Sequence, residues 1–190
     1  MKEKQQQTMY EAASIRDYDE LIQLWEASVR STHHFLTEDD IQYYKPLIRN
    51  EYFRAVKLYI IRDRKTEQIA AFMGLSDELI EMLFVHPAQQ GKGLGKTLLE
   101  YAIREKKMQK VDVNEQNTQA LHFYQNRGFE VIARDAIDGQ GKAYPILHMQ
   151  LKPVRLRKAE AGDLPELHSV FKQSVRNSCK KDYTPEQIEA

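Results

Sequence analysis

The fold of this chain is decided by residues 81–96, which have the sequence EMLFVHPAQQGKGLGK. An apolar, strand-like run ends at Pro87, and a loop with glycine at positions 91, 93 and 95 leads into a helical pattern. The backbone N–H groups of such a loop and the positive end of the helix dipole attract anions, and glycines let a phosphate approach the backbone. The stretch therefore predicts a phosphate site between a strand and a helix.

Three nucleotide-binding motifs resemble this loop to different degrees. The P-loop pattern G-x-x-x-x-G-K-[ST] matches at Gly95-Lys96-Thr97 but has Gln90 in place of its first glycine. The dinucleotide pattern G-x-G-x-x-G fails at Lys96. The pattern [Q/R]-x-x-G-x-[G/A] is matched fully by residues 90–95 and resembles the pyrophosphate loop of the GCN5-related N-acetyltransferases (GNAT). A P-loop nucleotide binder stays open as a weaker alternative.

A second motif supports the same resemblance. Residues 117–129, NTQALHFYQNRGF, match the GNAT pattern N-x-x-A-x-x-[FL]-Y-x-x-x-G-F at full spacing. The two motifs occur in the order found in that family, so the chain is identified as a member of the GNAT superfamily, of bacterial type. The resemblance extends over residues 10–151 and implies transfer of an acetyl group from acetyl-coenzyme A to a primary amine.

The periodicity of the chain predicts the elements of that fold. Residues 58–61, 68–75 and 78–85 are three successive strands, which favours antiparallel pairing. Residues 10–13 predict a short first strand, and Asp17 or Asp19 is expected to cap the helix that follows. The resemblance implies an α+β GNAT fold. Its mixed, mostly antiparallel central sheet is flanked by helices, and its splayed central strands hold the cofactor.

Composition limits the other possibilities. The 28 basic and 28 acidic residues give no net charge, so nothing favours nucleic-acid binding. The single cysteine excludes an internal disulfide. No apolar run approaches the ~18 residues of a membrane span, and the N-terminus lacks an apolar signal core. We expect a cytoplasmic protein with a disordered tail at residues 1–8 and a GNAT domain at 9–152.

From Val154 onward the sequence repeats its own beginning. Ser174 lies 146 positions after Ser28, and the same offset relates several neighbouring residues. A repeat with the period of a domain predicts that residues 153–190 are a partial second GNAT-like domain: a first strand, a first helix and the start of a second helix. The helix carries an apolar stripe, so we expect it to pack against the first domain or to form a homodimer with another chain.

The resemblance implies roles for individual residues. Glu81 would accept a proton from the amine, and Tyr124 would donate one to the departing thiolate. The alternative, purely structural interpretation is that Glu81 is a surface carboxylate and that Tyr124 is an aromatic residue of the core. Asn117 is also suited to capping a helix. The implied cofactor-binding residues are Leu83, Phe84, Val85, Gln90, Gly91, Lys92, Gly93, Gly95, Lys96 and Asn117.

The acceptor is less defined. His33, His34 and Phe35 fall in the loop that borders the acceptor pocket in the family, so they are candidate acceptor contacts. Two adjacent histidines without a third ligand do not predict a metal, and no metal is expected. The amine could be a small molecule, a peptide N-terminus or a lysine. We expect an enzyme in which the amine attacks acetyl-coenzyme A directly, with both substrates bound in a ternary complex. The alternative is a non-catalytic module that binds coenzyme A or acetyl-coenzyme A and serves as a sensor or in assembly.

Overall fold

The computed structural model describes residues 10–153 and 157–178. The chain divides into two units, Met1–Lys152 and Pro153–Ala190. The predicted tail at 1–8, the strand expected to begin at Val154 and the second helix start near Pro185 lie outside the described residues.

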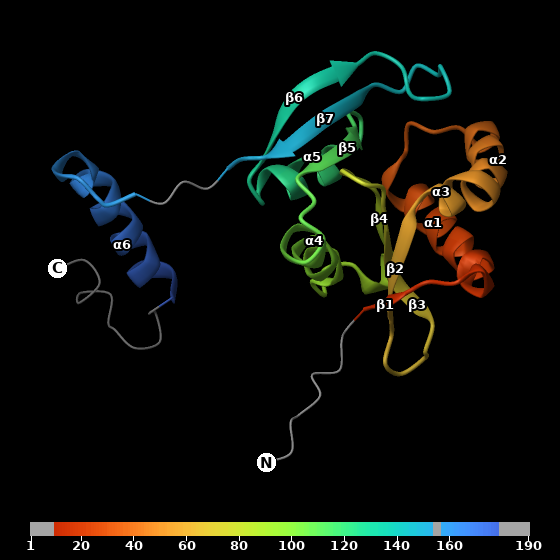
Figure 1. Ribbon diagram of the computed structural model, residues 1–190, viewed down its shortest axis with the longest axis horizontal. Coiled ribbons are helices and arrows are strands. Elements are labelled where there is room, and N and C mark those ends of the chain that lie inside the picture. The colour runs from red at the N-terminus through yellow and green to blue at the C-terminus, as the bar shows by residue number, and fades with distance from the viewer. Residues whose placement is uncertain (1–9, 154–156, 179–190) are drawn as a thin grey trace. The chain divides into compact units, whose positions relative to one another are not determined.

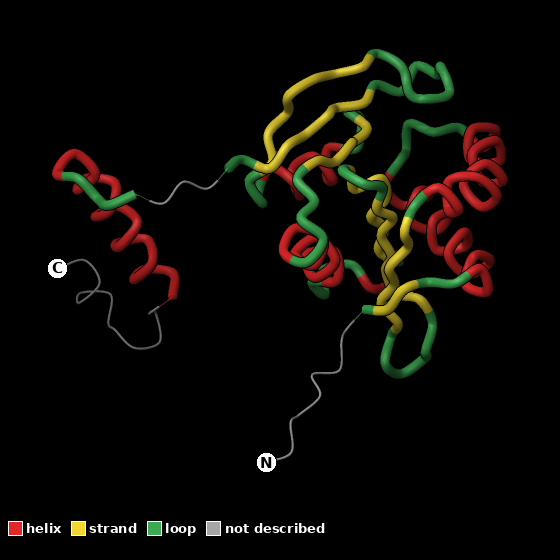
Figure 2. Tube along the Cα trace, in the orientation of Figure 1, coloured by secondary structure: helices red, strands yellow, loops and turns green. Residues whose placement is uncertain are grey.

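The first unit is built on a seven-stranded sheet (Figures 1 and 2). The strand order is β1-β2-β3-β4-β5-β7-β6, and every neighbouring pair is antiparallel except β4 and β5. The predicted α+β class with a mixed, mostly antiparallel sheet is therefore confirmed. The strands are β1 Glu11–Ala12, β2 Lys57–Arg62, β3 Ile69–Leu75, β4 Leu79–Val85, β5 Lys110–Asn114, β6 Phe129–Asp135 and β7 Ile146–Leu151.

Helices cover both faces of this sheet. Helices α1 to α3 lie on one side of strands β2 to β4, and α4 lies on the other (Figure 1). Each side has its own core, and neighbouring residues of β4 alternate between them: Leu83 and Val85 pack with α4, whereas Met82 and Phe84 pack with α1. The helices are α1 Tyr18–Thr32, α2 Glu38–Leu47, a π-helical stretch Ile48–Tyr52, α3 Phe53–Ala55, α4 Leu94–Arg104 and α5 Thr118–Gln125.

The start of α1 differs from the prediction. Its apolar residues, among them Leu21, Trp25 and Val29, are buried. Asp17 stands at the N-cap position of α1, but its side chain makes no capping hydrogen bond to the helix, and the capping side chain is Ser14, ahead of the turn that precedes α1. A short 3₁₀ turn, Ile15–Asp17, precedes the helix. The Ser14 side chain accepts from Arg16 N, and the Asp17 carboxylate accepts from Ser14 N at 2.7 Å. Asp17 is thus the third residue of the turn, and its side chain bonds back to Ser14 to complete a capping box. The helical spacing of the sequence alone does not show whether such an Asp is the capping residue or its partner three positions later.

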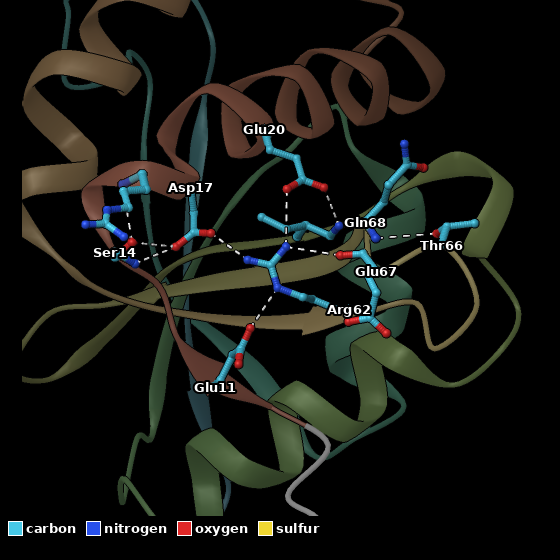
Figure 3. Close-up of polar contacts among 10 residues, drawn as sticks. Glu11, Ser14, Asp17, Glu20, Arg62, Thr66, Glu67 and Gln68 are labelled. Carbon is cyan, nitrogen blue, oxygen red and sulfur yellow. Dashed lines mark hydrogen bonds and ion pairs between the residues drawn. The ribbon is translucent and has the colours of Figure 1, made fainter.

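Arg62 ties the beginning of the chain to the sheet. Its guanidinium donates to Glu11, Asp17 and Glu20 at 2.8, 2.5 and 3.3 Å, and it lies at the centre of these carboxylates in Figure 3. Because the three acids belong to β1, the 3₁₀ turn and α1, one side chain of β2 fixes all three segments. This holds α1 in place along the sheet.

The central strands separate beside β4. Strands β4 and β5 pair only through Leu79–Lys110 and Ile80–Val111. Across the other edge of β4, Ile80 pairs with Leu75 and Met82 with Gly74, so Glu81 is the extra residue of a bulge. The predicted splay of the central strands is confirmed, and it begins at Glu81.

The second unit contains one described helix. A 3₁₀ turn at Ala161–Asp163 leads into α6, Leu164–Ser178. Arg157 donates to both carboxylate oxygens of Asp163 at 2.6 Å. The apolar stripe of the helix is exposed at Leu164, Leu167, Val170 and Phe171.

Candidate active site

A cavity of about 360 Å³ lies at the splay. Its walls come from the end of α1, from β4, from the glycine loop with the start of α4, and from α5. Tyr124, His33 and nine of the ten predicted cofactor residues line it: Leu83, Phe84, Val85, Gln90, Gly91, Gly93, Gly95, Lys96 and Asn117. Two motifs that are separate in the sequence thus meet at one cavity.

Of the residues predicted to bind the cofactor or to act in catalysis, Lys92 and Glu81 are not among those that line the cavity. Lys92 instead donates from Nζ to Gln89 at 2.7 Å. Glu81, the candidate proton acceptor, has an exposed side chain, which is also what its alternative interpretation as a surface carboxylate requires. The reason is the bulge, which takes Glu81 out of the alternation that aligns it with Leu83 and Val85.

The glycine loop has the backbone expected of an anion site. Gly91 and Gly93 have φ of +75° and +83°, and Gly93 occupies the N-cap position of α4 without a side chain. The first N–H groups of a helix have no partner within it, so those of α4 are free to face a ligand at the loop. Gly95 lies in α4 and lines the cavity, and a Cβ there would be in ordinary contact with Val85 Cγ2 at 3.5 Å and with Phe123 Cε2 at 3.6 Å.

Tyr124 is suited to donate a proton or a hydrogen bond. The residue is 6% exposed and lines the cavity. Burial raises the pKa of its phenol, and the positive charge of Arg127 opposes that shift. Tyr124 therefore stays protonated at neutral pH, as a donor must. Arg127 stacks on Phe123, with its guanidinium carbon 3.7 Å from the ring centroid.

Asn117 and His33 meet across the cavity. Asn117 caps α5, because its Oδ1 accepts from Ala120 N at 3.1 Å. Its Nδ2 lies 3.4 Å from His33 Nε2. Burial, with a smaller effect of the charge of His34, lowers the pKa of His33 to about 4. The imidazole is therefore neutral at physiological pH.

His34 and Phe35 lie elsewhere. They line a second cavity of about 500 Å³ together with Ser31, Thr32 and residues 116–119. Thr32, Asn117 and Gln119 line both cavities. The predicted acceptor loop is therefore divided, with His33 at the first cavity and His34 and Phe35 at the second.

Helix α2 is tied to the loop between β6 and β7. Asp40 is 7% exposed and accepts from Thr37, Lys142 and Tyr144, while Tyr44 donates to Asp138. The hydrogen bond from Lys142 is the largest of several that hold the pKa of Asp40 well below its usual range. Since Tyr144 also packs on Phe35, with centroids 5.7 Å apart, this network supports the predicted acceptor loop.

The sequence did not point to several residues of the cavity walls, among them Ser28, Gln119, Phe123 and Arg127. Ser28 carried a usable signal, since it is a polar residue on the otherwise apolar face of α1 and is 4% exposed. Phe123 belongs to the second motif. Gln119 and Arg127 also lie within that motif, but at variable positions for which its pattern specifies no residue.

Two kinds of feature are absent from the part of the chain that the structure describes. Within residues 10–153 and 157–178, no group of three or more His, Cys, Asp or Glu side chains could hold a metal ion. Over the same residues, no helix is long and apolar enough to cross a membrane.

Comparison with known proteins agrees with this geometry. The model of the acetyltransferase (GNAT) domain matches residues 54–131. The peptidyl-lysine N-acetyltransferase YjaB of Salmonella typhimurium is 35% identical over 131 residues, which cover 69% of this chain and 89% of that protein.

Solved structures give the same result. The apo form of YjaB from Escherichia coli has a TM-score of 0.69 at 31% identity and covers 76% of this chain and 97% of its own. The PaiA N-acetyltransferase of Thermoplasma acidophilum, solved in complex with coenzyme A, shares the fold with a TM-score of 0.57 at 20% identity, over 74% of this chain and 97% of its own. The chain therefore belongs to the GCN5-related N-acetyltransferases, enzymes that take their acetyl group from acetyl-coenzyme A.

Proposed function

We propose that this chain acetylates the ε-amine of lysine residues in peptides or proteins. The observation that carries the proposal is the single cavity at which the glycine loop, the separated edge of β4 and Tyr124 meet. The peptidyl-lysine acceptor is suggested by the name of YjaB, the 35% identical relative. A small-molecule amine and a peptide N-terminus are the other acceptors to be tested.

In this proposal the cofactor spans the cavity. Its pyrophosphate binds the backbone of the glycine loop and the N-terminus of α4. Its pantetheine arm pairs with the backbone of Leu83 and Val85 as an added strand does. The short β4–β5 ladder supports this placement, because β4 has no β5 partner beyond Ile80. A backbone N–H near Phe84 would bind the oxygen of the tetrahedral intermediate.

The chemistry needs two proton transfers. The uncharged amine attacks the thioester carbon, the C–S bond breaks, and N-acetyl-lysine and coenzyme A are formed. We assign Glu81 as the acceptor of the amine proton. Its exposed side chain at the start of the splay requires that the proton travel through water. Tyr124 protonates the departing thiolate and regains its proton from solvent.

The acceptor contacts are assigned to His33, His34 and Phe35. The described residues that line the second cavity include no Asp, Glu, Lys or Arg. Such a lining offers nothing to hold a polycation, whereas Ser, Thr, Asn and Gln side chains suit the amide groups of a peptide. This favours a lysine within a peptide over a small polyamine.

We also propose that residues 9–152 are the GNAT domain and that residues 153–190 begin a second GNAT-like domain. Ala161–Asp163 and α6 repeat the first 3₁₀ turn and α1 with the same lengths, at an offset of 146 positions. Each 3₁₀ turn begins with a capping box, with φ and ψ of −114° and 170° at Ser14 and −113° and 165° at Glu160. A cytoplasmic location and a homodimer through this second unit stay predictions.

The test is a peptide acetylation assay. We expect the chain to acetylate an N-terminally blocked lysine peptide and to release coenzyme A. Tyr124→Phe should lower kcat on the order of 100-fold while the affinity for acetyl-coenzyme A stays within twofold, because general acid catalysis typically contributes at least this much. Tyr101→Phe, on α4 and outside the cavity lining, is the matched control.

Two results would contradict the proposal. Turnover of free amines but of no lysine peptide would reject the acceptor assignment. Tight binding of acetyl-coenzyme A with no turnover of any amine would favour the non-catalytic sensor. Glu81→Gln tests the base separately, since its loss should shift the ascending limb of the pH–rate profile.

A further inference from the structure

His33 is held firmly at the end of α1. Its backbone N–H donates to Val29 O at 2.8 Å, and its carbonyl accepts from Leu36 N at 3.0 Å. The imidazole lies near two aromatic rings, with its centroid 5.3 Å from that of Phe35 and 6.4 Å from that of Phe84. Phe84 is on the splayed part of β4, so the imidazole stands where the thioester is expected to lie.

The hydrogen bonds around His33 identify its tautomer. Thr32 Oγ1 lies 2.8 Å from Ser28 O, and a carbonyl only accepts, so the hydroxyl donates its proton there. Thr32 Oγ1 is therefore the acceptor in its 2.8 Å contact with His33 Nδ1, which must carry the ring proton. Nε2 then holds the lone pair.

Asn117 leads to the same tautomer from the opposite side. Its Oδ1 is engaged by Ala120 N at the start of α5, which turns Nδ2, a donor, toward His33 Nε2. The contact measures 3.4 Å, which is longer than the 2.7–3.2 Å of ordinary N–H hydrogen bonds. The contact with Asn117 thus indicates that Nε2 is a hydrogen-bond acceptor, but it is too long to be a strong hydrogen bond to the Nε2 lone pair.

The chemistry of the reaction needs such a group. An alkyl amine with a pKa near ~10 is mostly ammonium at neutral pH and attacks only after losing a proton. A carboxylate beside the amine would favour the charged form, whereas a neutral nitrogen acceptor orients the uncharged form. Among the described residues that line either cavity there is no Asp or Glu.

We propose that His33 Nε2 accepts a hydrogen bond from the acceptor amine and directs its lone pair at the thioester carbon. This inference rests on the proposed function and deepens it. His33 binds the substrate and takes no proton from it, while Thr32 and Asn117 are positioning residues that hold its tautomer.

The kinetic test compares two substitutions of His33. His33→Leu keeps a side chain of similar bulk without an acceptor and should raise the KM for a lysine peptide about tenfold, since a lost hydrogen bond leaves the N–H unpaired. His33→Gln places an amide oxygen near the position of Nε2 and should keep the KM within about threefold of wild type. The KM for acetyl-coenzyme A should change less than twofold in both.

Two controls separate this role from a structural one. His122→Leu changes an exposed histidine of α5 outside both cavity linings, and it should leave all constants unchanged. The pH dependence of kcat/KM should have the same shape in the wild type and in His33→Leu. Loss of an ascending limb in His33→Leu would make His33 the base and overturn the proposal.

A spectroscopic measurement needs no substrate. In the ¹⁵N spectrum of histidine-labelled chain at pH 7, His33 should show a protonated Nδ1 and an unprotonated Nε2. Thr32→Val removes the hydroxyl that accepts from Nδ1, so the imidazole should no longer prefer this tautomer. Thr32→Ser keeps the hydroxyl and should keep the preference for a protonated Nδ1. A protonated Nε2 in the wild type would overturn the inference.

The outcomes also separate the two proposals. A chain that acetylates no lysine peptide would overturn the proposed function. A chain that does so, with equal peptide KM in the wild type and in His33→Leu, would overturn the role of His33 alone.

Discussion

At the scale of single residues, the glycines of the loop have different tasks. Gly93 adopts a left-handed conformation, and a Cβ built on it would meet no atom within 4 Å. Gly95 lies in α4 and would bring a Cβ into ordinary contact with Leu83, Val85 and Phe123. Glycine is therefore favoured by the backbone conformation at position 93, whereas the fold has room for a Cβ at position 95.

This difference predicts opposite effects of the same substitution. Gly93→Ala should lower the free energy of unfolding by about 1 kcal/mol, because a left-handed backbone is strained for an L-residue. Gly95→Ala should leave it unchanged or raise it by up to ~1 kcal/mol through the higher helix propensity of alanine. Urea unfolding measures both, and an equal loss in the two variants would contradict this assignment.

Most of the wall of the first cavity could be predicted from the sequence, because the residues proposed to bind the cofactor form groups that are contiguous in the chain. The spacing of residues in the glycine loop and in residues 117–129 is enough to predict the local loop and helix that each segment forms. The sequence left open whether Glu81 is buried or exposed, since a bulge leaves no trace in hydrophobic alternation, and the structure shows that its side chain is exposed. Arg127 was missed because only the fold brings the residues that follow α5 to the same cavity as β4 and the end of α1.

At the scale of elements, His148 bridges the three strands beyond the splay. From β7 its Nδ1 lies 2.8 Å from Asp112 on β5, and its Nε2 lies 3.2 Å from Asp135 on β6. The hydrogen bond with Asp112, followed by the one with Asp135, raises the pKa of His148 in spite of the opposing effect of burial. The protonated imidazole therefore links two carboxylates across the sheet.

The sign of this shift predicts a pH dependence. The folded state binds the proton more tightly than the unfolded state, so the stabilisation is complete below the unfolded pKa of about 6.5 and is lost as pH rises through the raised folded pKa. Urea unfolding of the wild type and His148→Gln should differ by about 0.5 kcal/mol at pH 6 and converge at high pH. A difference that grows with pH would contradict the bridge.

The order of the helices and strands along the chain was predicted more accurately than the residues at which they begin and end. Hydrophobic periodicity located α1 and strands β2 to β4, because each buries one regular face. The helical pattern included Asp17, the N-cap residue of α1, among its candidates but missed the capping side chain of Ser14, since a 3₁₀ turn adds three residues ahead of the helix. The tie between α2 and the β6–β7 loop depends on Asp40 and Lys142, which are 102 positions apart, and no local pattern predicts it.

At the scale of the whole molecule, the first unit contains the complete sheet and both cavities. A chain of residues 1–152 should therefore unfold cooperatively and show an upward shift in melting temperature with acetyl-coenzyme A, because a ligand that binds only the native state stabilises it. ATP is the control ligand, and an equal shift with ATP would favour the P-loop alternative.

The same truncation tests the predicted homodimer. If α6 joins two chains, the full chain should sediment as a dimer, and both residues 1–152 and a Leu167→Glu, Phe171→Glu double variant should sediment as monomers. If the full chain sediments as a monomer, the homodimer is rejected. That result would not change the affinity for acetyl-coenzyme A that we expect of the first unit.

The short ladder between β4 and β5 has a consequence for amide hydrogen exchange. Most central strands protect their N–H groups on both edges, but β4 is paired with β5 only at Leu79 and Ile80. In the ligand-free protein, N–H groups of residues 82–85 that point toward the splay should exchange with solvent deuterium as fast as those of a loop. Bound coenzyme A would slow them, so the middle of this sheet becomes continuous only while its ligand is present.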